Sequence, residues 1–516
     1  MEAKKRSMMA GSAVAAGALL LTTVVSGCGG SSGGNTSNSG AASGSKSQGP
    51  VTISMIYDFA GKEFPKAGNE VQRAIEKYTN TKLNIQALPS TTYAQKIPVM
   101  VASGDLPDVI AGDPHAQGSS WLLNAIQQGQ FWDLTPYIKQ YPKLFNINPV
   151  ILKNAEVNGH LYGLPRVRPL ARNVTFVRAD WLKNLGLQVP KTLNQYLDML
   201  RKFTHDDPDK DGKNDTFGAS VTTAFATTVD SFAVAFGAPN NWEVVNGKFI
   251  KDVDTPQYLQ GLEFEKKMYD EHLVNSDSAV IQRPQWEGYF FDGKAGSIGN
   301  TSNTGDAYLA SLKQNNPKAE ITAFSALKAP NGKIRVPAGP GYNGELMFPK
   351  SSVKTEAQLK QILDFFEKLD ERPMANLLAY GIEGKDYTVK NGKAVINPNS
   401  DYMDTVGYPY RYTLGVVDPT TYAIPAANLS AIDKLTNKLV EENDKYAVVD
   451  PTYTLTSPTY QQRGAQLDKL LTDANTQFLL GKITVQQWKA QVKKWHEEGG
   501  DQIAKEYAEA YAKQQK

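Results

Sequence analysis

The fold is decided by a stretch that begins VTISMIY at residues 51–57 and continues with KLNIQAL at residues 82–88. Both segments have the short, apolar and β-branched composition of buried strands. Between them, apolar residues recur at helical spacing over residues 71–78. A second helical segment at 93–103 and a third strand at 108–111 follow. This alternation predicts an α/β fold with a parallel sheet covered by helices on both faces.

Composition limits what surrounds this stretch. The chain has 516 residues, of which 41% are hydrophobic, which is more apolar material than one domain usually buries, so we expect two lobes. The last third has helical periods instead, such as Leu359, Ile362, Leu363 and Phe366, which predict a helical C-terminal tail.

The beginning of the chain predicts the compartment. A charged stub at 4–6 precedes an apolar run at 8–25, which is the layout of a signal peptide over residues 1–27. The run ends in VSGC, which resembles a lipobox, and Cys28 is the only cysteine, so we expect it to carry a lipid. Residues 28–50 are rich in Gly and Ser and predict a flexible tether. We therefore expect an anchored protein on the extracellular face of the cell membrane, of the Gram-positive type.

Charge and motifs exclude several functions. The formal net charge of +2 becomes zero once Lys4, Lys5, Arg6 and Glu2 are removed with the signal peptide (+2 − 3 + 1 = 0). The chain then lacks the excess of positive charge that is typical of a nucleic-acid-binding protein. The five histidines are scattered, and neither HExxH nor GxSxG occurs. The GxGxxG match at 339–344 contains Pro340 and does not open a helix, so a loop is the better interpretation. A secreted polysaccharide-active enzyme, a glycoside hydrolase or lyase, stays open as the alternative to a binding protein. An adhesive surface protein is a third class.

A series of motifs resembles the extracellular solute-binding proteins of ABC importers. These motifs are SGDLPDV at 103–109, NGHLYGLP at 158–165, RADWLKNLGL at 178–187, FDGKA at 291–295 and GIEGKDYT at 381–388. The nearest similarity within that family is to the large lipoproteins and alginate-oligosaccharide binders that carry a calcium loop. The resemblance implies a binding protein without catalysis, a monomer that captures an oligosaccharide and delivers it to the transmembrane subunits of a permease.

The resemblance also implies a two-lobed, periplasmic-binding-protein-like fold of type II, whose lobes close on the ligand about a hinge. The chain is expected to cross between lobes near 163–172, 299–301 and 348–352. We therefore predict an N-lobe of residues 51–165 and 300–350, and a C-lobe of residues 166–299 and 351–516. The ligand is expected in the cleft between them.

One loop predicts a metal site. The sequence DPDKDGKND at 207–215 places carboxylates at positions 1, 3, 5 and 9 of an EF-hand-type loop, with Gly at position 6. Hard oxygen ligands favour calcium, in a structural role. Position 12 is Gly218, so the bidentate Glu of a full EF-hand is missing. The resembling proteins use a shortened loop with a further ligand directly after position 9. The predicted ligands are Asp207, Asp209, Asp211, Lys213 through its carbonyl, Asp215 and Thr216; an acidic turn without an ion is the alternative.

The ligand-binding residues are harder to predict. A sugar needs an aromatic face and polar partners for its hydroxyl groups, a mixture that occurs in several loop-like segments. From these segments we expect contacts from Trp286, Tyr410, Trp242, Tyr342, Arg411 and Glu287. Trp286 and Tyr410 are the main stacking candidates, and the alternative for either ring is simple packing in a core.

Overall fold

The computed structural model describes residues 49–59, 63–116, 118–222 and 229–515. The predicted signal peptide, Cys28 and all but the end of the tether lie outside these residues. Because residues 49–516 form one compact unit, the folded body is described by itself.

The first sheet contains the three predicted strands. Its order is β2 (Thr81–Pro89), β1 (Val51–Phe59), β3 (Val109–Gly112), β12 (Tyr342–Met347) and β4 (Gly163–Val167). β1 runs parallel to β2 and β3, whereas β12 is antiparallel to β3 and β4. The α/β prediction for this stretch is confirmed.

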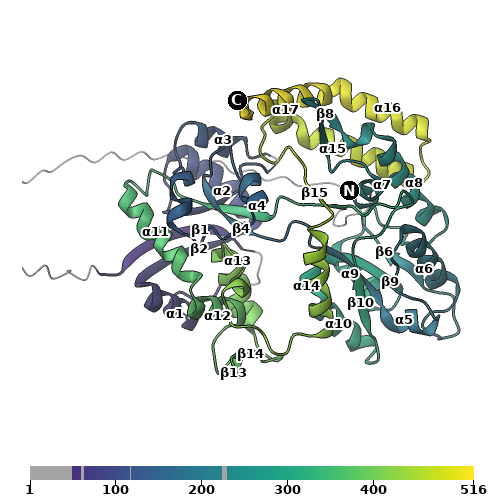
Figure 1. Cartoon of the computed structure of the whole chain (residues 1–516), viewed down its shortest axis with the longest axis horizontal. Helices are drawn as coiled ribbons and strands as arrows, with labels where there is room; N and C mark the ends of the chain where they lie inside the picture. The colour runs from purple at the N-terminus through teal and green to yellow at the C-terminus, as the bar shows by residue number, and fades with distance from the viewer. Residues whose placement is uncertain (1–48, 60–62, 117, 223–228, 516) are drawn as a thin grey trace, which may run out of the picture. The chain divides into compact units, whose positions relative to one another are not determined.

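Helices cover both faces of this sheet (Figure 1). The helix α1 (Glu70–Thr79) packs with α11 (Glu356–Leu369) and α12 (Arg372–Tyr380). These helices enclose one core with the side of β1 that carries Ile53 and Met55. The helices α2 (Ser90–Ser103) and α3 (Ser120–Gln127) enclose a second core with the opposite side. Because successive side chains of a strand point to opposite faces, Ile53 and Met55 pack with one set of helices and Ile56 with the other.

The second sheet has the order β10 (Ile321–Phe324), β5 (Asn173–Arg178), β9 (Ala295–Thr301) and β6 (Phe217–Ser220). Its two faces contribute to separate cores, one with α6 (Leu193–His205) and the other with α9 (Arg283–Phe291) and α10 (Gly305–Asn315). The two sheets are the centres of the two lobes, as the α/β prediction expects.

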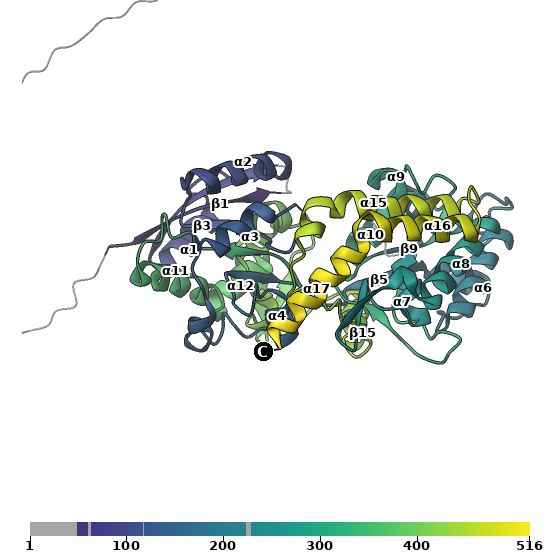
Figure 2. The ribbon, with the colours of Figure 1, turned by 90° about the horizontal axis from the view of Figure 1, so that it is seen from above.

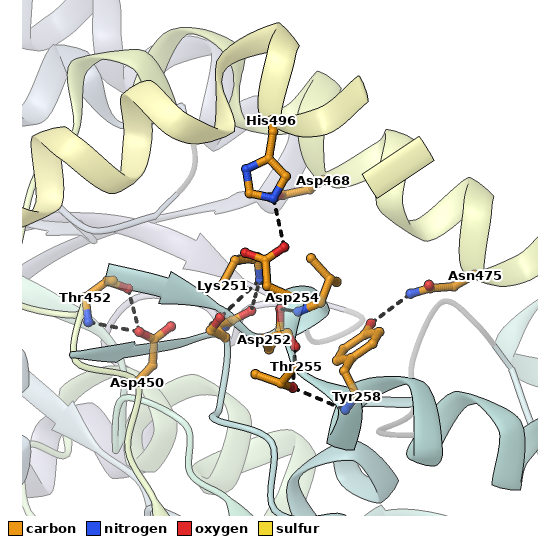
Figure 3. A network of polar contacts seen from close by, with 12 residues as sticks. Lys251, Asp252, Asp254, Thr255, Tyr258, Asp450, Thr452, Asp468, Asn475 and His496 are labelled. Atoms are coloured by element: carbon orange, nitrogen blue, oxygen red, sulfur yellow. Dashed lines mark hydrogen bonds and ion pairs between the residues drawn. The ribbon is translucent and has the colours of Figure 1, made fainter. Parts of the chain in front are cut away.

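The C-terminal tail is helical, as predicted. It comprises α15 (Pro458–Leu479), α16 (Val485–Trp495) and α17 (Asp501–Gln514), which pack on α8 (Pro256–Asp270) and on the hairpin of β7 (Trp242–Val245) and β8 (Lys248–Lys251). Figures 1 and 2 both show α15 and α16 side by side near α8. His496, at the end of α16, holds the tail against the segment before α8. Its Nε2 lies 2.8 Å from Asp254 Oδ1 (Figure 3).

The distribution of the chain between the lobes differs from the predicted boundaries. Residues 321–324, predicted in the N-lobe, form β10 and pair with β5 of the second sheet. The helices α11 and α12, predicted in the C-lobe, bury Leu359, Ile362 and Leu378 in a core of the first sheet. Both differences have one cause: the chain returns to the first sheet only at β12 and stays there through the segment around Leu414.

Further elements join these parts, and the longest of them, α14 (Ala431–Asn443), packs through Ile432 in a core of the second sheet. They are α4 (Pro149–Asn154), α5 (Ala179–Asn184), α7 (Val229–Phe236), β11 (Val336–Pro337), β13 (Tyr387–Lys390), β14 (Lys393–Ile396), η4 (Met403–Arg411), α13 (Tyr412–Leu414), α14 (Ala431–Asn443) and β15 (Ala447–Val448). Among the described residues, no helix has both the length and the apolar character needed to cross a membrane.

Candidate functional site

Charged side chains gather at one edge of the first sheet. There the carboxyl ends of β1, β3 and β4 meet the start of β12, the edge outside which α/β sheets bind ligands. Arg166, near the end of β4, is 7% exposed, and its Nη2 lies 3.9 Å from Asp58 Oδ1. Burial lowers the pKa of Arg166, while Asp58 and Asp113 counteract this effect. The edge therefore holds a buried cation with nearby but not tightly paired acids.

Glu345 lies in the same region and is fully buried. Neither of its carboxylate oxygens has a hydrogen-bond partner among the described residues. Burial raises the pKa of Glu345 well above its usual range, and the charge of Asp113 raises it further. Gly163, on the neighbouring strand β4, has to stay small, because a Cβ there would lie 2.7 Å from Glu345 Oε2. Burial therefore favours the neutral form of Glu345, whose carboxyl oxygens have unused hydrogen-bonding capacity among the described residues.

His115 adds a second unused group. Its Nε2 is buried without a partner in the part of the chain that the structure describes, and burial lowers the pKa of the imidazole although Asp113 acts in the opposite sense. The imidazole is therefore neutral near pH 7.

A cavity lies at the corresponding edge of the second sheet. There the ends of β6, β9 and β10 meet the start of β5, and the cavity measures about 130 Å³. Its apolar wall includes Tyr196, Phe232 and Phe324. Its polar side chains are Asn173, Thr175, Ser220, Ser231, Ser325, Arg335 and Asn443. This combination of an apolar wall and several hydrogen-bonding groups suits a small polar ligand.

A second pocket, of about 250 Å³, lies where β4 continues towards β5. Its wall includes Tyr412, flanked by the guanidinium groups of Arg168 and Arg411 at 5.3 and 5.7 Å from the ring centre. Arg411 Nη2 donates to Asp418 Oδ1 at 3.1 Å. The ring of Tyr408 lies 6.0 Å from that of Tyr412, and Tyr408 is 41% exposed. Aromatic, cationic and amide groups thus meet beside a segment that connects the two sheets.

The two aromatic residues predicted to stack on a sugar are both buried. Trp286 lies in α9, not in a loop, is 1% exposed, and donates from Nε1 to Ser220 O at 3.2 Å. Tyr410 is 0% exposed, and its hydroxyl accepts a hydrogen bond from Asn69 Nδ2 at 2.6 Å. The two rings belong to different cores, Trp286 to one of the second sheet and Tyr410 to one of the first. In this structure both rings pack in cores, which is the alternative considered for them.

The other predicted ligand residues are also dispersed. Trp242 is buried under the C-terminal helices, and Tyr342 is buried in the first sheet with its hydroxyl donating to Asn154 O. Glu287 accepts a hydrogen bond from the Tyr308 hydroxyl at 2.8 Å. Of the six predicted residues, only Arg411 lines a pocket described above.

Tyr408, Tyr412, Arg168 and Arg166 were not among the individual residues predicted to contact the ligand. Both tyrosines belong to the segment YPYRY at 408–412, which has the composition of a sugar site. The missing information was which of its three tyrosines faces solvent.

The acidic loop at 207–215 brings three of the predicted metal ligands together. Carboxylate oxygens of Asp207, Asp209 and Asp211 lie within 4.8 Å of one another. Asp209 Oδ1 is buried without a hydrogen-bond partner among the described residues, and burial followed by the charge of Asp211 raises the pKa of Asp209. An orphaned buried carboxylate oxygen beside two further carboxylates fits a hard cation such as Ca²⁺.

The other predicted ligands are placed elsewhere. Asp215 pairs with Lys294, whose Nζ lies 2.6 Å from its Oδ2. The hydroxyl of Thr216 is buried and donates to Phe203 O at 2.8 Å. Lys213 pairs through its side chain with Asp211 at 2.9 Å. The three-carboxylate cluster is therefore the part of the predicted site that the structure assembles.

Comparisons with known proteins agree with this architecture. The model of the bacterial extracellular solute-binding protein family matches residues 60–373. Lipoprotein LipO of Bacillus subtilis (strain 168) is 34% identical over 91% of this chain and 93% of its own. The polygalacturonan/rhamnogalacturonan-binding protein YtcQ of the same organism is 36% identical over 85% of this chain and 87% of its own.

A solved structure shares the fold. It is the substrate-binding protein FusA of the Streptococcus pneumoniae ABC transporter, an EF-hand mutant in complex with fructo-nystose. It superposes with a TM-score of 0.62 at 17% identity and covers 90% of this chain and 99% of that one. The matched family model and the two Bacillus relatives establish that this chain belongs to the bacterial extracellular solute-binding protein family.

Proposed function

We propose that this protein is the substrate-binding lipoprotein of an ABC importer, which captures an oligosaccharide between its two lobes and delivers it to the permease. Membership of a solute-binding family favours capture over the alternative of a secreted polysaccharide-active enzyme. The names of the relatives support a carbohydrate, since YtcQ is named for polygalacturonan and rhamnogalacturonan and FusA for fructooligosaccharides.

The observation that carries the proposal is the pocket beside the β4–β5 connection. It combines the ring of Tyr412 with Arg168, Arg411 and Asn148, and the exposed ring of Tyr408 lies next to it. An aromatic face for the sugar ring and a rim of polar groups for its hydroxyls are what a carbohydrate site requires. Since this pocket adjoins a connection between the sheets, a bound sugar would bias the arrangement of the lobes.

The Tyr408 ring provides the test. Tyr408→Ala removes an exposed aromatic face and should weaken oligosaccharide binding by about 1–3 kcal/mol, roughly ten- to a hundredfold in Kd. Tyr78→Ala is the matched control, because Tyr78 is 37% exposed and lies on α1, away from the pocket. Calorimetric titration of the full chain in detergent with a panel of oligosaccharides measures both variants. Equal affinities for the two variants and the unmodified chain would remove Tyr408 from the site.

We also propose that Ca²⁺ occupies the cluster of Asp207, Asp209 and Asp211 and holds the loop after α6. The orphaned oxygen of Asp209 supports this assignment, and the EF-hand of FusA shows that a relative in the same fold class has such a loop. When bound, the ion would supply the charge compensation that three close carboxylates need.

The anchoring proposal rests on the sequence. The VSGC motif at 25–28 and the similarity to a lipoprotein support a lipid on Cys28. The chain would then work as an anchored monomer at the extracellular face of the membrane, within reach of the permease through the tether at 28–50.

A further inference from the structure

Two connections between the first and second sheets run beside each other. The first, residues 168–172, leads from β4 to β5, and the second, which leads from β10 through β11 to β12, ends with residues 338–341. Two backbone hydrogen bonds of 2.7 Å join them, from Arg168 N to Gly341 O and from Gly339 N to Leu170 O. The two connections therefore form a short ladder between the lobes.

Asn240 fixes the second-lobe end of the later connection. It lies just before β7 and is 7% exposed. Its Nδ2 donates to Ala338 O and to Val448 O, each at 2.8 Å, so both hydrogens of the amide group are used. Ala338 N donates to Val448 O at 3.0 Å, and the Tyr453 hydroxyl donates to Ala338 O at 3.3 Å. Ala338 is thus held to second-lobe segments through both its N–H and its carbonyl.

Asn443 fixes the second-lobe end of the earlier connection. It is the last residue of α14 and is 1% exposed. Its Nδ2 donates to Ala171 O at 2.8 Å, and its Oδ1 accepts from Ser325 Oγ, directly after β10, at 2.7 Å. The Ser325 hydroxyl therefore selects the orientation of the amide in which its NH2 group faces Ala171.

Short stretches of both connections lie outside these side-chain contacts, next to the first sheet. They are residues 168–170 and 339–341. The later stretch contains two glycines, and Gly341 has a φ of 86°, a backbone conformation that favours glycine. The third connection, residues 427–430, leads directly into α14, the helix that carries Asn443. Motion of the lobes therefore has its freest backbone on the first-lobe side of the two asparagines.

We infer that Asn240 and Asn443 are positioning residues for lobe closure, which hold the connections to the second lobe so that the lobes rotate about residues 168–170 and 339–341. A hinge is a few residues that absorb a large change in φ and ψ, and rigid contacts on one side confine the change to them. This inference rests on the proposed capture of a sugar between two lobes and adds the residues that control the motion.

The test measures the distance between the lobes in the sugar-free full chain. Because Cys28 is the only cysteine, nitroxide labels can be attached selectively to Val99→Cys and Val280→Cys in a Cys28→Ser chain. Val99 lies on α2 of the first lobe and Val280 lies before α9 of the second, and they are 67% and 75% exposed. Double electron–electron resonance then gives the distribution of distances between the labels.

The variants remove the contacts of the asparagines. Asn240→Ala and Asn443→Ala delete the amide groups. Asn275→Ala is the matched control, because Asn275 is 5% exposed and also bonds to a backbone N–H and a backbone carbonyl, but within the second lobe. Tyr453→Phe and Ser325→Ala each remove one hydroxyl and serve as milder variants. Melting temperatures establish which variants are folded.

We expect Asn240→Ala and Asn443→Ala each to broaden the distance distribution, because each adds a place where a connection bends, and the double variant to broaden it further. Asn275→Ala should keep the distribution of the unmodified chain even if its melting temperature falls by as much. An unchanged distribution in the folded Asn240 and Asn443 variants would overturn the inference, and so would equal broadening in Asn275→Ala.

If the Asn240 and Asn443 variants do not fold, Tyr453→Phe and Ser325→Ala decide. A broader distribution in these two variants supports the inference, and an unchanged one overturns it. Because no sugar is present, a failure to bind oligosaccharides in calorimetry is a separate result that would contradict the proposed function.

Discussion

His496 provides a quantitative test of how the C-terminal helices are held. Its Nε2 lies 2.8 Å from Asp254 Oδ1 and its Nδ1 lies 2.7 Å from Asp501 Oδ1. Figure 3 shows the contact with Asp254, which joins the end of α16 to the segment before α8. The hydrogen bond to Asp254, supported by the one to Asp501, raises the pKa of His496 from 6.5 to about 9.

The sign of the pH dependence follows from the raised pKa. Because the folded protein binds the proton more tightly than the unfolded chain, the stabilisation is complete below about pH 6.5 and is lost as the pH rises through about 9. The full change in pKa corresponds to roughly 3 kcal/mol. The imidazole is 29% exposed and Asp501 is 79% exposed, so solvent screening reduces the expected contribution to about 1–2 kcal/mol.

The assay is urea unfolding of the full chain between pH 6 and pH 10. His496→Gln should be less stable than the unmodified chain by about 1–2 kcal/mol at pH 6, and the difference should disappear near pH 10. His205→Gln is the control, because His205 is exposed at the end of α6. If the difference in unfolding free energy between His496→Gln and the unmodified chain stays constant across this range, the stabilisation does not depend on protonation of His496 and the reasoning is refuted.

Three further predictions concern burial and metal binding. Trp286→Ala should reduce the free energy of unfolding by about 3–5 kcal/mol and leave oligosaccharide affinity within about twofold, since the ring packs in a core; intact stability in chemical denaturation would contradict this. Glu345→Gln should raise the melting temperature at pH 7 but not at pH 4. The pKa of Glu345 is raised in the folded protein, so the protein loses stability as the pH rises above the unfolded pKa of about 4.3. A melting temperature unchanged at both pH values would show that Glu345 has other partners. Chelation should lower the melting temperature of the unmodified chain, with about 2.7 kcal/mol lost from a site held at a hundred times Kd, and should have no effect on Asp209→Ala with Asp211→Ala; an equal response of both proteins would remove calcium from the loop.

Local sequence patterns predicted individual helices and strands better than they predicted which lobe each of them joins. The strand at 51–57 and the helix after it were predictable because the apolar composition of the one and the helical spacing of apolar residues over 71–78 are local features. The lobe of β10 and of α11 was not, since it depends on pairings between residues more than a hundred positions apart. Similarly, the acidic loop was recognisable from spacing alone, whereas the pairing of Asp215 with Lys294 joins distant segments.

The aromatic residues show the same limit. Trp286 follows Pro284 in a segment that reads as a loop, yet Pro stands in the first turn of α9 and the indole turns into the core. In YPYRY, the turn η4 directs Tyr410 inward and leaves Tyr408 exposed, an outcome that composition does not specify. The arginines were not predicted because a charged residue is usually exposed, and only the structure shows that Arg166 is buried at the edge of the first sheet.

Calorimetry of the full chain with defined oligosaccharides, followed by chromatography of the recovered sugar, tests oligosaccharide capture most directly. A substrate-binding lipoprotein should take up one oligosaccharide per chain in a saturable manner and return it at its original length. Recovery of shortened or unsaturated sugars would contradict capture without catalysis and would establish the enzyme instead.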